Sequence, residues 1–290
     1  RNRFMLPLIG VTGSNGKTTV KEMIASILRQ ATTAGAAENN GSLDPVLATE
    51  GNLNNDIGVP QMLLRLRQHH RYAVIEMGMN HVGEISYLTQ LAKPSIALIT
   101  NAGAAHIEGL GSIEAVARAK AEIFEGLDQQ GTAIINADDS YAPLWRKCAG
   151  SRPIIDFGLR EKARVSADYS TDPLMNTIQL KLPDGMETIQ LQTPGVHNVY
   201  NALAAAAATT ALGIPKESIA SGLECFRGVK GRMQKKLGLH HALLIDDTYN
   251  ANPESVRAAL AVLASTKGKK ILILGDMGEL GQSTVDLHRM

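Results

Sequence analysis

The stretch that decides the expected fold is Gly10-Val11-Thr12-Gly13-Ser14-Asn15-Gly16-Lys17-Thr18-Thr19. It follows an apolar run, 6–11, that predicts a strand, and it leads into residues 18–30, whose apolar positions recur with helical spacing. A glycine-bearing turn between a strand and a helix presents backbone N–H groups to an anion at the helix N-terminus. We therefore expect ATP or GTP to bind here, through Gly13, Ser14, Asn15, Gly16, Lys17, Thr18 and Thr19.

Two side chains give this loop its expected chemistry. Lys17 would neutralise the β- and γ-phosphates, and Thr18 would offer its hydroxyl to Mg²⁺. The usual spelling, G-x-x-x-x-G-K-[ST], fails at one position because Val11 stands where the first glycine belongs. A glycine turn with an incidental lysine is the alternative, but the flanking strand and helix favour phosphate binding.

The rest of the chain alternates short apolar runs with helical patterns, which is typical of βαβ units around a parallel sheet. From about residue 164 the pattern becomes alternating, and Pro183-Asp184-Gly185 predicts a turn in a small antiparallel ribbon. Residues 31–58 show no period and are expected to form a structureless functional loop. Strands are expected at 72–76, 96–100, 133–136, 242–245 and 271–274, and helices at 84–91, 113–124, 198–212, 217–226 and 253–263.

The predicted fold class is therefore α/β, a phosphate-loop-containing, mostly parallel sheet flanked by helices, with the small ribbon and the start of a second domain. A length of 290 residues agrees with about two domains. Lys and Arg number 29 against 28 Asp and Glu, so the net charge of +1 gives no field that favours nucleic acid. No apolar run is long enough to insert into a membrane. Cys148 and Cys225 lie far apart and are expected to be isolated thiols, which favours the cytoplasm.

Two further residues, Glu76 and His106, are candidates for chemistry at the carboxyl edge of the sheet, where open α/β sheets bind ligands. Glu76 ends a predicted strand and could hold Mg²⁺, although a solvated acid is the alternative. His106 lies in the loop after another strand, and a structural or surface histidine is the alternative. Lys120 lies on a predicted helix, where a solvated lysine is the default.

Seven blocks spanning nearly the whole chain, in order, resemble the Mur ligase family. They are GVTGSNGKTTVKEM (10–23), GNLNNDIGVP (51–60), VIEMGMNHVGEI (74–85), AHIEGLGSIEAVARAKAEIF (105–124), PGVHNVYNALAAAA (194–207), DDTYNANPESVRAAL (246–260) and GDMGELG (275–281). The resemblance implies a central ATP-binding domain at 1–232 and part of a C-terminal Rossmann-like domain at 233–290, with the family's N-terminal UDP-binding domain absent from this chain.

Within the family, the asparagine-rich block and the DDTYNANP block are most similar to ligases that join D-alanyl-D-alanine to UDP-N-acetylmuramoyl-tripeptide. This likeness implies ATP-dependent, ADP-forming peptide-bond synthesis through an acyl phosphate, in the making of peptidoglycan precursors. The partners are then small molecules, and a monomer is expected. Departures from the expected spelling at residues 31–50 leave the conformation of that loop open.

The resemblance also implies roles for single residues. Two Mg²⁺ ions are expected, and the residues implied to hold them are Thr18, Glu76, His106 and Lys120, the last as a carbamate. The implied catalytic residues are Lys17, Glu76, His106 and Lys120. The implied ATP contacts outside the loop are Asn198, Asn201, Arg232 and Asp247. Asn198 could instead cap the following helix. Weaker candidates for substrate contact are Asn55, Asn80 and His81.

Two alternatives to this activity stay open. The chain could be another acid:amino-acid ligase of the same superfamily, such as the tripeptide-forming Mur ligase or folylpolyglutamate synthetase. It could also be a nucleotide-binding module without ligase activity, because the flanking domains are missing or partial. The amine acceptor that stimulates phosphate release would separate the ligase that adds D-alanyl-D-alanine from the other ligases of the superfamily. Measuring whether the UDP-linked substrate binds would test the nucleotide-binding module.

Overall fold

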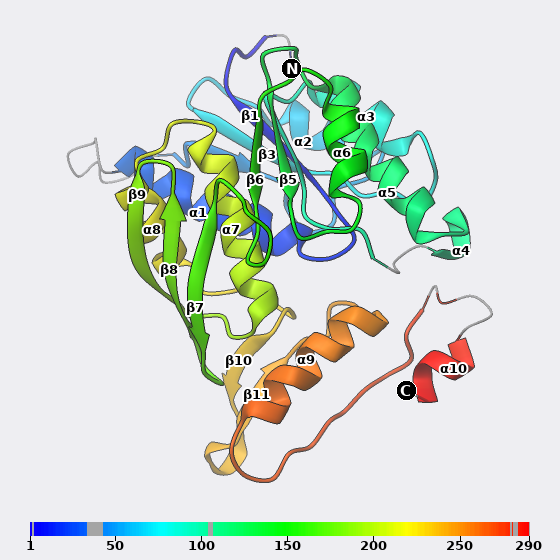
Figure 1. Cartoon of the computed structure of the whole chain (residues 1–290), viewed down its shortest axis with the longest axis vertical. Coiled ribbons are helices and arrows are strands. Elements are labelled where there is room, and N and C mark those ends of the chain that lie inside the picture. Colours follow the sequence, from blue (N-terminus) through cyan, green and yellow to red (C-terminus); the bar gives the residue numbers. More distant parts are fainter. Residues whose placement is uncertain (2, 34–42, 104–106, 279, 281–283, 290) are drawn as a thin grey trace.

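A six-stranded parallel sheet forms the centre of the protein (Figure 1), whose structure is a computed structural model describing residues 1, 3–33, 43–103, 107–278, 280 and 284–289. Its strand order is β2-β3-β1-β4-β5-β6. The strands are β1 (Leu8–Thr12), β2 (Val46–Ala48), β3 (Tyr72–Glu76), β4 (Ile96–Ile99), β5 (Thr132–Asn136) and β6 (Ile154–Phe157). Because all six run parallel, their carboxyl ends share one edge, where the loop after β1 also lies.

Helices cover both faces of this sheet, which is why its strands are almost wholly apolar. Alternate residues of β1 enter opposite cores: Ile9 and Val11 pack on one side, and Leu8 on the other. The first core is closed by α1 (Lys17–Thr33), α7 (Val196–Thr210) and α8 (Lys216–Cys225). The second is closed by α2 (Gly58–Leu64), α3 (Glu84–Ala92), α5 (Ile113–Ala121), η1 (Glu122–Gly126) and α6 (Ala142–Ala149), while the short α4 (Ile107–Leu110) precedes α5.

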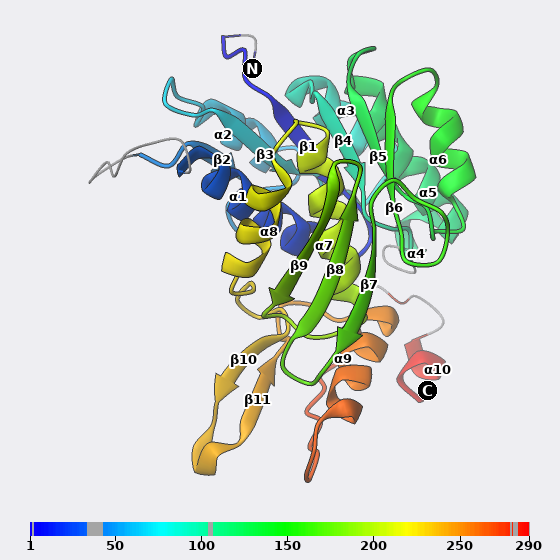
Figure 2. The same ribbon diagram turned by 60° about the vertical axis from the view of Figure 1, so that its left-hand side comes forward.

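The middle of helix α7, residues 201–209, is buried on all sides, which explains its run of alanines. Residues 202–208 are at most 1% exposed. Small side chains let this helix lie close to the parallel sheet and also to a three-stranded antiparallel sheet, β7 (Ser166–Thr171), β8 (Asn176–Leu182) and β9 (Gly185–Leu191). Figure 2 shows this antiparallel sheet beside α7 and α8.

The C-terminal part of the chain forms a separate group of elements beyond α7 (Figures 1 and 2). It contains the hairpin of β10 (Gln234–Leu237) and β11 (Leu243–Asp246), joined by η2 (Leu239–His241), then α9 (Pro253–Ser265) and α10 (Thr284–Arg289). The start of α9 is well defined, because Asn252 and Ser255 form reciprocal capping hydrogen bonds.

Most of the predicted elements are confirmed, and two predictions are wrong. Residues 271–274 were expected to form a strand, but they lie outside any helix or strand, and Ile273 is 91% exposed. A strand needs a hydrogen-bonding neighbour, and β11 pairs with β10 instead. The loop expected to be structureless over 31–58 contains β2, and α1 extends into it as far as Thr33; residues 34–42 lie outside the described part. Among the described residues, no helix is long and apolar enough to cross a bilayer.

Candidate functional site

The phosphate-loop candidate lies at the carboxyl edge of the sheet, and α1 begins at its Lys17. Gly13 and Gly16 have positive φ values of 150° and 85°, which favour glycine. The Lys17 Nζ donates to the carbonyl of Gly13 at 2.8 Å and lies 3.3 Å from that of Ser14. The lysine therefore folds back over its own loop, as a cation poised for phosphate would.

Burial lowers the pKa of Lys17 from its usual value, an effect that nearby Glu76 opposes and Arg232 strengthens. The Arg232 guanidinium reaches the start of α1 from beyond residue 230: its Nη2 donates to the Thr18 hydroxyl at 3.3 Å. The same guanidinium stacks on Tyr249, 4.1 Å from the ring centroid. Two cations from distant parts of the chain thus meet at this glycine-bearing loop.

Glu76 is buried next to this loop, so the solvated-acid alternative is wrong. It is 2% exposed and pairs in register with Val11, two residues before Gly13. Its Oε1 accepts a hydrogen bond of 2.8 Å from the Nδ2 of Asn54. Its Oε2 is buried and has no hydrogen-bond partner in the part of the chain that the structure describes. An unpaired buried carboxylate oxygen is costly, and a hard cation would satisfy it.

Lys120, on α5, is also buried, so the solvated-lysine alternative is wrong as well. It is 1% exposed. Burial, and secondarily the charge of Lys17, lower the pKa of Lys120 well below its usual value. Burial therefore favours the neutral amine more at Lys120 than at an exposed lysine. His106 lies outside the described residues, and among those that are described no cluster of three His, Cys, Asp or Glu side chains could hold a metal.

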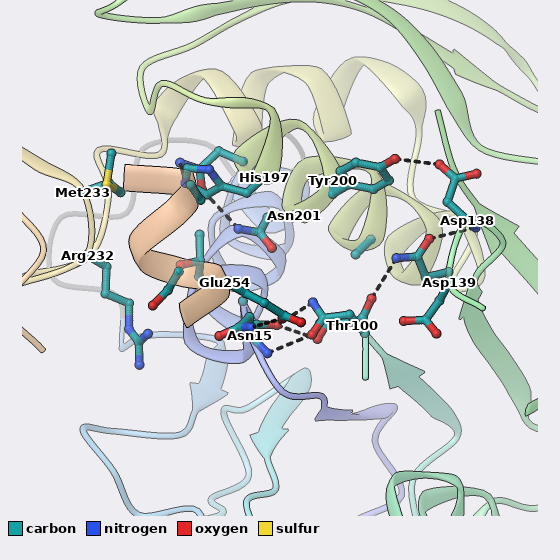
Figure 3. Close-up of a pocket in the computed structure, with 18 of the residues that line it drawn as sticks. Asn15, Thr100, Asp138, Asp139, His197, Tyr200, Asn201, Arg232, Met233 and Glu254 are labelled. Carbon is teal, nitrogen blue, oxygen red and sulfur yellow. Dashed lines mark hydrogen bonds between the residues drawn. The ribbon is translucent and has the colours of Figure 1, made fainter. Parts of the chain in front are cut away.

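A cavity of about 380 Å³ opens on one side of the phosphate loop (Figure 3). His197, Tyr200 and Asn201 of α7 face it, and Arg232 and Glu254 reach it from the C-terminal part of the chain. Burial lowers the pKa of His197 to about 4, so its imidazole is neutral at pH 7. A mixed polar and apolar cavity of this size suits a nucleoside.

Asn198 and Asn201, two of the expected ATP contacts, lie together in this cavity. Asn201 donates to the Asn198 side chain at 3.1 Å, and Asn198 donates to the Pro194 carbonyl at 2.8 Å. The alternative in which Asn198 caps α7 is wrong, because the helix begins at Val196 with Gly195 as the N-cap residue. Asp247 also lines the cavity; it accepts from the Met233 backbone N–H at 3.0 Å, and burial raises its pKa.

A second cavity, of about 370 Å³, opens on the other side of the loop. The candidates Asn55 and Asn80 both line it, together with Lys17 and Glu76. The third candidate, His81, is exposed and does not line it. The two cavities therefore share the phosphate loop, with Asn15, Gly16 and Arg232 lining both.

The structure adds residues that sequence reasoning missed. Asn252, which caps α9, donates to the Asn15 Oδ1 at 2.7 Å, and Asn15 in turn donates to the Glu254 Oε2 at 3.0 Å. These bonds tie the first turn of α9 to the phosphate loop. Asn54 was missed although its neighbour Asn55 was named; the asparagine-rich spelling was a signal, but it did not say which side chain faces Glu76.

Comparison with known proteins agrees with this arrangement. Residues 11–209 match the model of the Mur ligase middle domain, and residues 231–290 match that of the Mur ligase, glutamate ligase domain. The chain belongs to the Mur ligase family.

Two relatives that are similar over nearly the whole of this chain carry the same enzyme name. The chain is 44% identical over 281 residues to UDP-N-acetylmuramoyl-tripeptide--D-alanyl-D-alanine ligase of Haemophilus influenzae, covering 97% of this chain and 59% of the relative. It is 42% identical to the Escherichia coli enzyme of that name, covering 99% of this chain and 62% of the relative. The chain thus spans about three fifths of the length of these relatives.

Solved structures of the same kind superimpose on this fold. A crystal structure of MurF from Acinetobacter baumannii gives a TM-score of 0.90 at 44% identity, over 98% of this chain and 59% of that one. MurF ligase from Thermotoga maritima, solved in complex with ADP, gives 0.85 at 27% identity, over 99% of this chain and 64% of that one.

Proposed function

We propose that the protein is an ATP-dependent, ADP-forming ligase that joins D-alanyl-D-alanine to UDP-N-acetylmuramoyl-tripeptide in the synthesis of peptidoglycan precursors. The observation that carries this proposal is the phosphate loop between two cavities. ATP would lie with its base against α7 and its γ-phosphate at Lys17. The UDP-linked tripeptide, which donates the acyl group, and the dipeptide, which accepts it, would meet that phosphate from the second cavity, beside Glu76.

The reaction proceeds in two substitutions. An oxygen of the tripeptide carboxylate attacks the γ-phosphorus, ADP leaves, and an acyl phosphate forms; the dipeptide amine then attacks the acyl carbon and phosphate leaves. A carboxylate that approaches a triphosphate meets repulsion of about 4 kcal/mol per pair of unit charges at 4 Å and an effective dielectric of 20. Lys17 and Arg232 offset this repulsion because both lie at the loop.

We propose that two Mg²⁺ ions bind with the ATP, where they would neutralise charge on the transferring phosphoryl group. Thr18 offers a hydroxyl at the start of α1, and the unpaired Oε2 of Glu76 offers a buried anionic oxygen. His106 is part of the same proposed set. Asn198, Asn201 and Asp247 would bind the adenosine moiety, and Asn55 and Asn80 the acyl substrate.

Lys120 is proposed to carry a carbamate. Its neutral amine would attack the carbon of CO₂, forming an N–C bond and releasing one proton, so that a buried base becomes an anion suited to orient a metal. Intact mass spectrometry and a high-resolution map, both at adequate bicarbonate, test this proposal. A plain amine in both would contradict it.

Turnover tests the ligase proposal. The chain, and the same chain extended to the length of its relatives, are assayed for phosphate release with UDP-N-acetylmuramoyl-tripeptide and each of several amine acceptors. We expect D-alanyl-D-alanine to stimulate release, and diaminopimelate, lysine and glutamate not to. Lys17→Met should abolish turnover, whereas the matched control Lys162→Met, at an exposed position, should not. Stimulation by glutamate or diaminopimelate would favour another member of the superfamily.

A second function is considered because the chain spans only 59% and 62% of two relatives. In that case these 290 residues bind nucleotide without ligase activity. We propose 1–232 as the ATP-binding domain and 233–290 as part of the next domain. Calorimetry with ADP and with the UDP-linked tripeptide separates the two functions, since binding of ADP alone favours the module.

We further propose that the protein is a monomer in the cytoplasm. Light scattering would test the oligomeric state.

A further inference from the structure

Among the described residues, one side chain donates a hydrogen bond to the carboxylate of Glu76, and that side chain is Asn54. We propose that Asn54 is a positioning residue, which fixes one oxygen of Glu76 and thereby turns the other toward the cation bound at the phosphate loop. This inference rests on the proposed function, because it assumes a divalent cation at Glu76.

Two hydrogen bonds fix Glu76. Its backbone N–H donates to the Thr49 hydroxyl at 2.9 Å, which holds the end of β3. Its Oε1 accepts from the Asn54 Nδ2 at 2.8 Å, which sets the plane of the carboxylate. The Oε2, buried and without a partner among the described residues, is then left for another ligand. The two oxygens of Glu76 therefore differ, because the Asn54 amide donates to Oε1 and not to Oε2.

Asn54 is itself held in place. Its backbone carbonyl accepts from the Gly78 N–H at 2.8 Å, and its own N–H donates to the Asn52 carbonyl at 2.7 Å. Its amide packs against Gly78, since a Cβ added there would lie 3.1 Å from the Asn54 Cγ. These contacts join the asparagine-rich loop to the segment that follows Glu76, so the amide and the carboxylate keep their relative position.

The segment before this loop is anchored by a buried cation. Lys21 of α1 is 1% exposed, and its Nζ donates to the Thr49 carbonyl at 2.6 Å. The Thr49 N–H donates to the Val74 carbonyl at 3.0 Å. Thr49 therefore connects α1 to the end of β3. The support for Glu76 thus extends from the helix that carries the phosphate loop to the loop that carries Asn54.

The chemistry of the donor matters as much as its position. An asparagine amide is neutral, so it orients the carboxylate without neutralising it, whereas a lysine or arginine would compete with a bound cation. Partners that orient a metal-binding carboxylate typically change metal affinity by about 10- to 100-fold when they are removed. A purely structural role for Asn54, satisfying a buried oxygen, would instead change stability and leave metal affinity alone.

The test compares Asn54→Ala and Asn54→Ser with the matched control Asn52→Ala, an exposed asparagine of the same loop. The serine hydroxyl is too short to reach Oε1, but it keeps the position polar should the alanine variant fail to fold. Binding of Mn²⁺ in the presence of β,γ-methylene-ATP is measured by electron paramagnetic resonance. Binding of the ATP analogue without metal, and thermal unfolding without ligands, are measured alongside.

We expect Mn²⁺ to bind about 10- to 100-fold more weakly to both Asn54 variants, with metal-free analogue binding unchanged, and wild-type values in the control. Unchanged Mn²⁺ affinity in a folded Asn54 variant would overturn the inference while leaving the proposed function intact. An equal loss in Asn52→Ala would also overturn it. If the wild-type chain binds the analogue but no Mn²⁺, the metal part of the proposed function fails, and this inference fails with it.

Discussion

Acidification should destabilise the folded chain through His197, which lines the cavity beside α7. Burial lowers the pKa of this half-buried histidine to about 4, against the usual 6.5 of an unfolded chain. Between these values the unfolded chain binds a proton that the folded chain does not. The stability linked to His197 is therefore complete above pH 6.5, falls as the pH decreases, and is lost near pH 4.

The magnitude follows from the difference between the two pKa values. A tenfold change in proton affinity is equivalent to about 1.4 kcal/mol. Lowering the pKa of His197 from 6.5 to about 4 therefore changes the free energy of unfolding by about 3 kcal/mol. Because the imidazole of His197 is partly exposed to solvent, which weakens the cost of charging it, we expect acidification to lower the free energy of unfolding by about 2 kcal/mol. For a chain of 290 residues, a loss of about 2 kcal/mol lowers the melting temperature by about 3 °C.

Thermal unfolding of the wild type and of His197→Gln, at about pH 7.5 and about pH 4.5, measures this effect. The glutamine variant should lose less stability on acidification than the wild type, by the amount worked out above. His240→Gln, at an exposed position, serves as the control and should follow the wild type. Equal losses in the wild type and in His197→Gln would refute the reasoning.

Three further substitutions test two buried hydrogen bonds and the space around the phosphate loop. Trp145→Phe should cost about 2–4 kcal/mol in urea unfolding, because Trp145 is fully buried and its indole N–H donates to the Ala117 carbonyl of α5 at 3.0 Å. Tyr200→Phe removes the hydroxyl that donates to the buried Asp138 carboxylate at 2.7 Å, and should cost about 1.5–3 kcal/mol in the same measurement. Gly16→Ala, at a φ of +85° and with a new Cβ 2.4 Å from an amide oxygen of α7, should weaken ADP binding at least tenfold by calorimetry, while wild-type affinity would show that the loop tolerates a side chain.

The fold could largely be predicted because its signals are local. Apolar runs and a glycine turn specify β1, the phosphate loop and α1 within a few neighbouring residues, and helical spacing marked α3, α5, α7 and α8. The failure at 271–274 has the same cause, since an apolar run carries no record of whether a neighbouring strand will pair with it.

The candidate site divides in the same way. Lys17 and Thr18 could be named from spacing alone, because the loop that carries them is continuous in sequence. Lys120 could not be separated from an ordinary helical lysine without a resemblance, since its burial depends on what α5 packs against. The contacts of Asn15 with Asn252 and Glu254 join residues more than two hundred positions apart, and no local pattern records them.

The type of fold, the position of the phosphate loop and the residue types available for chemistry could be inferred from the order of the residues, because periodicity and turn chemistry act over short distances along the chain. The folded chain alone shows which of those side chains are buried, which charges meet, and that Asn54, not Asn55, contacts Glu76. Burial and hydrogen-bond partners depend on segments brought together by packing, so they exist only once the chain has folded.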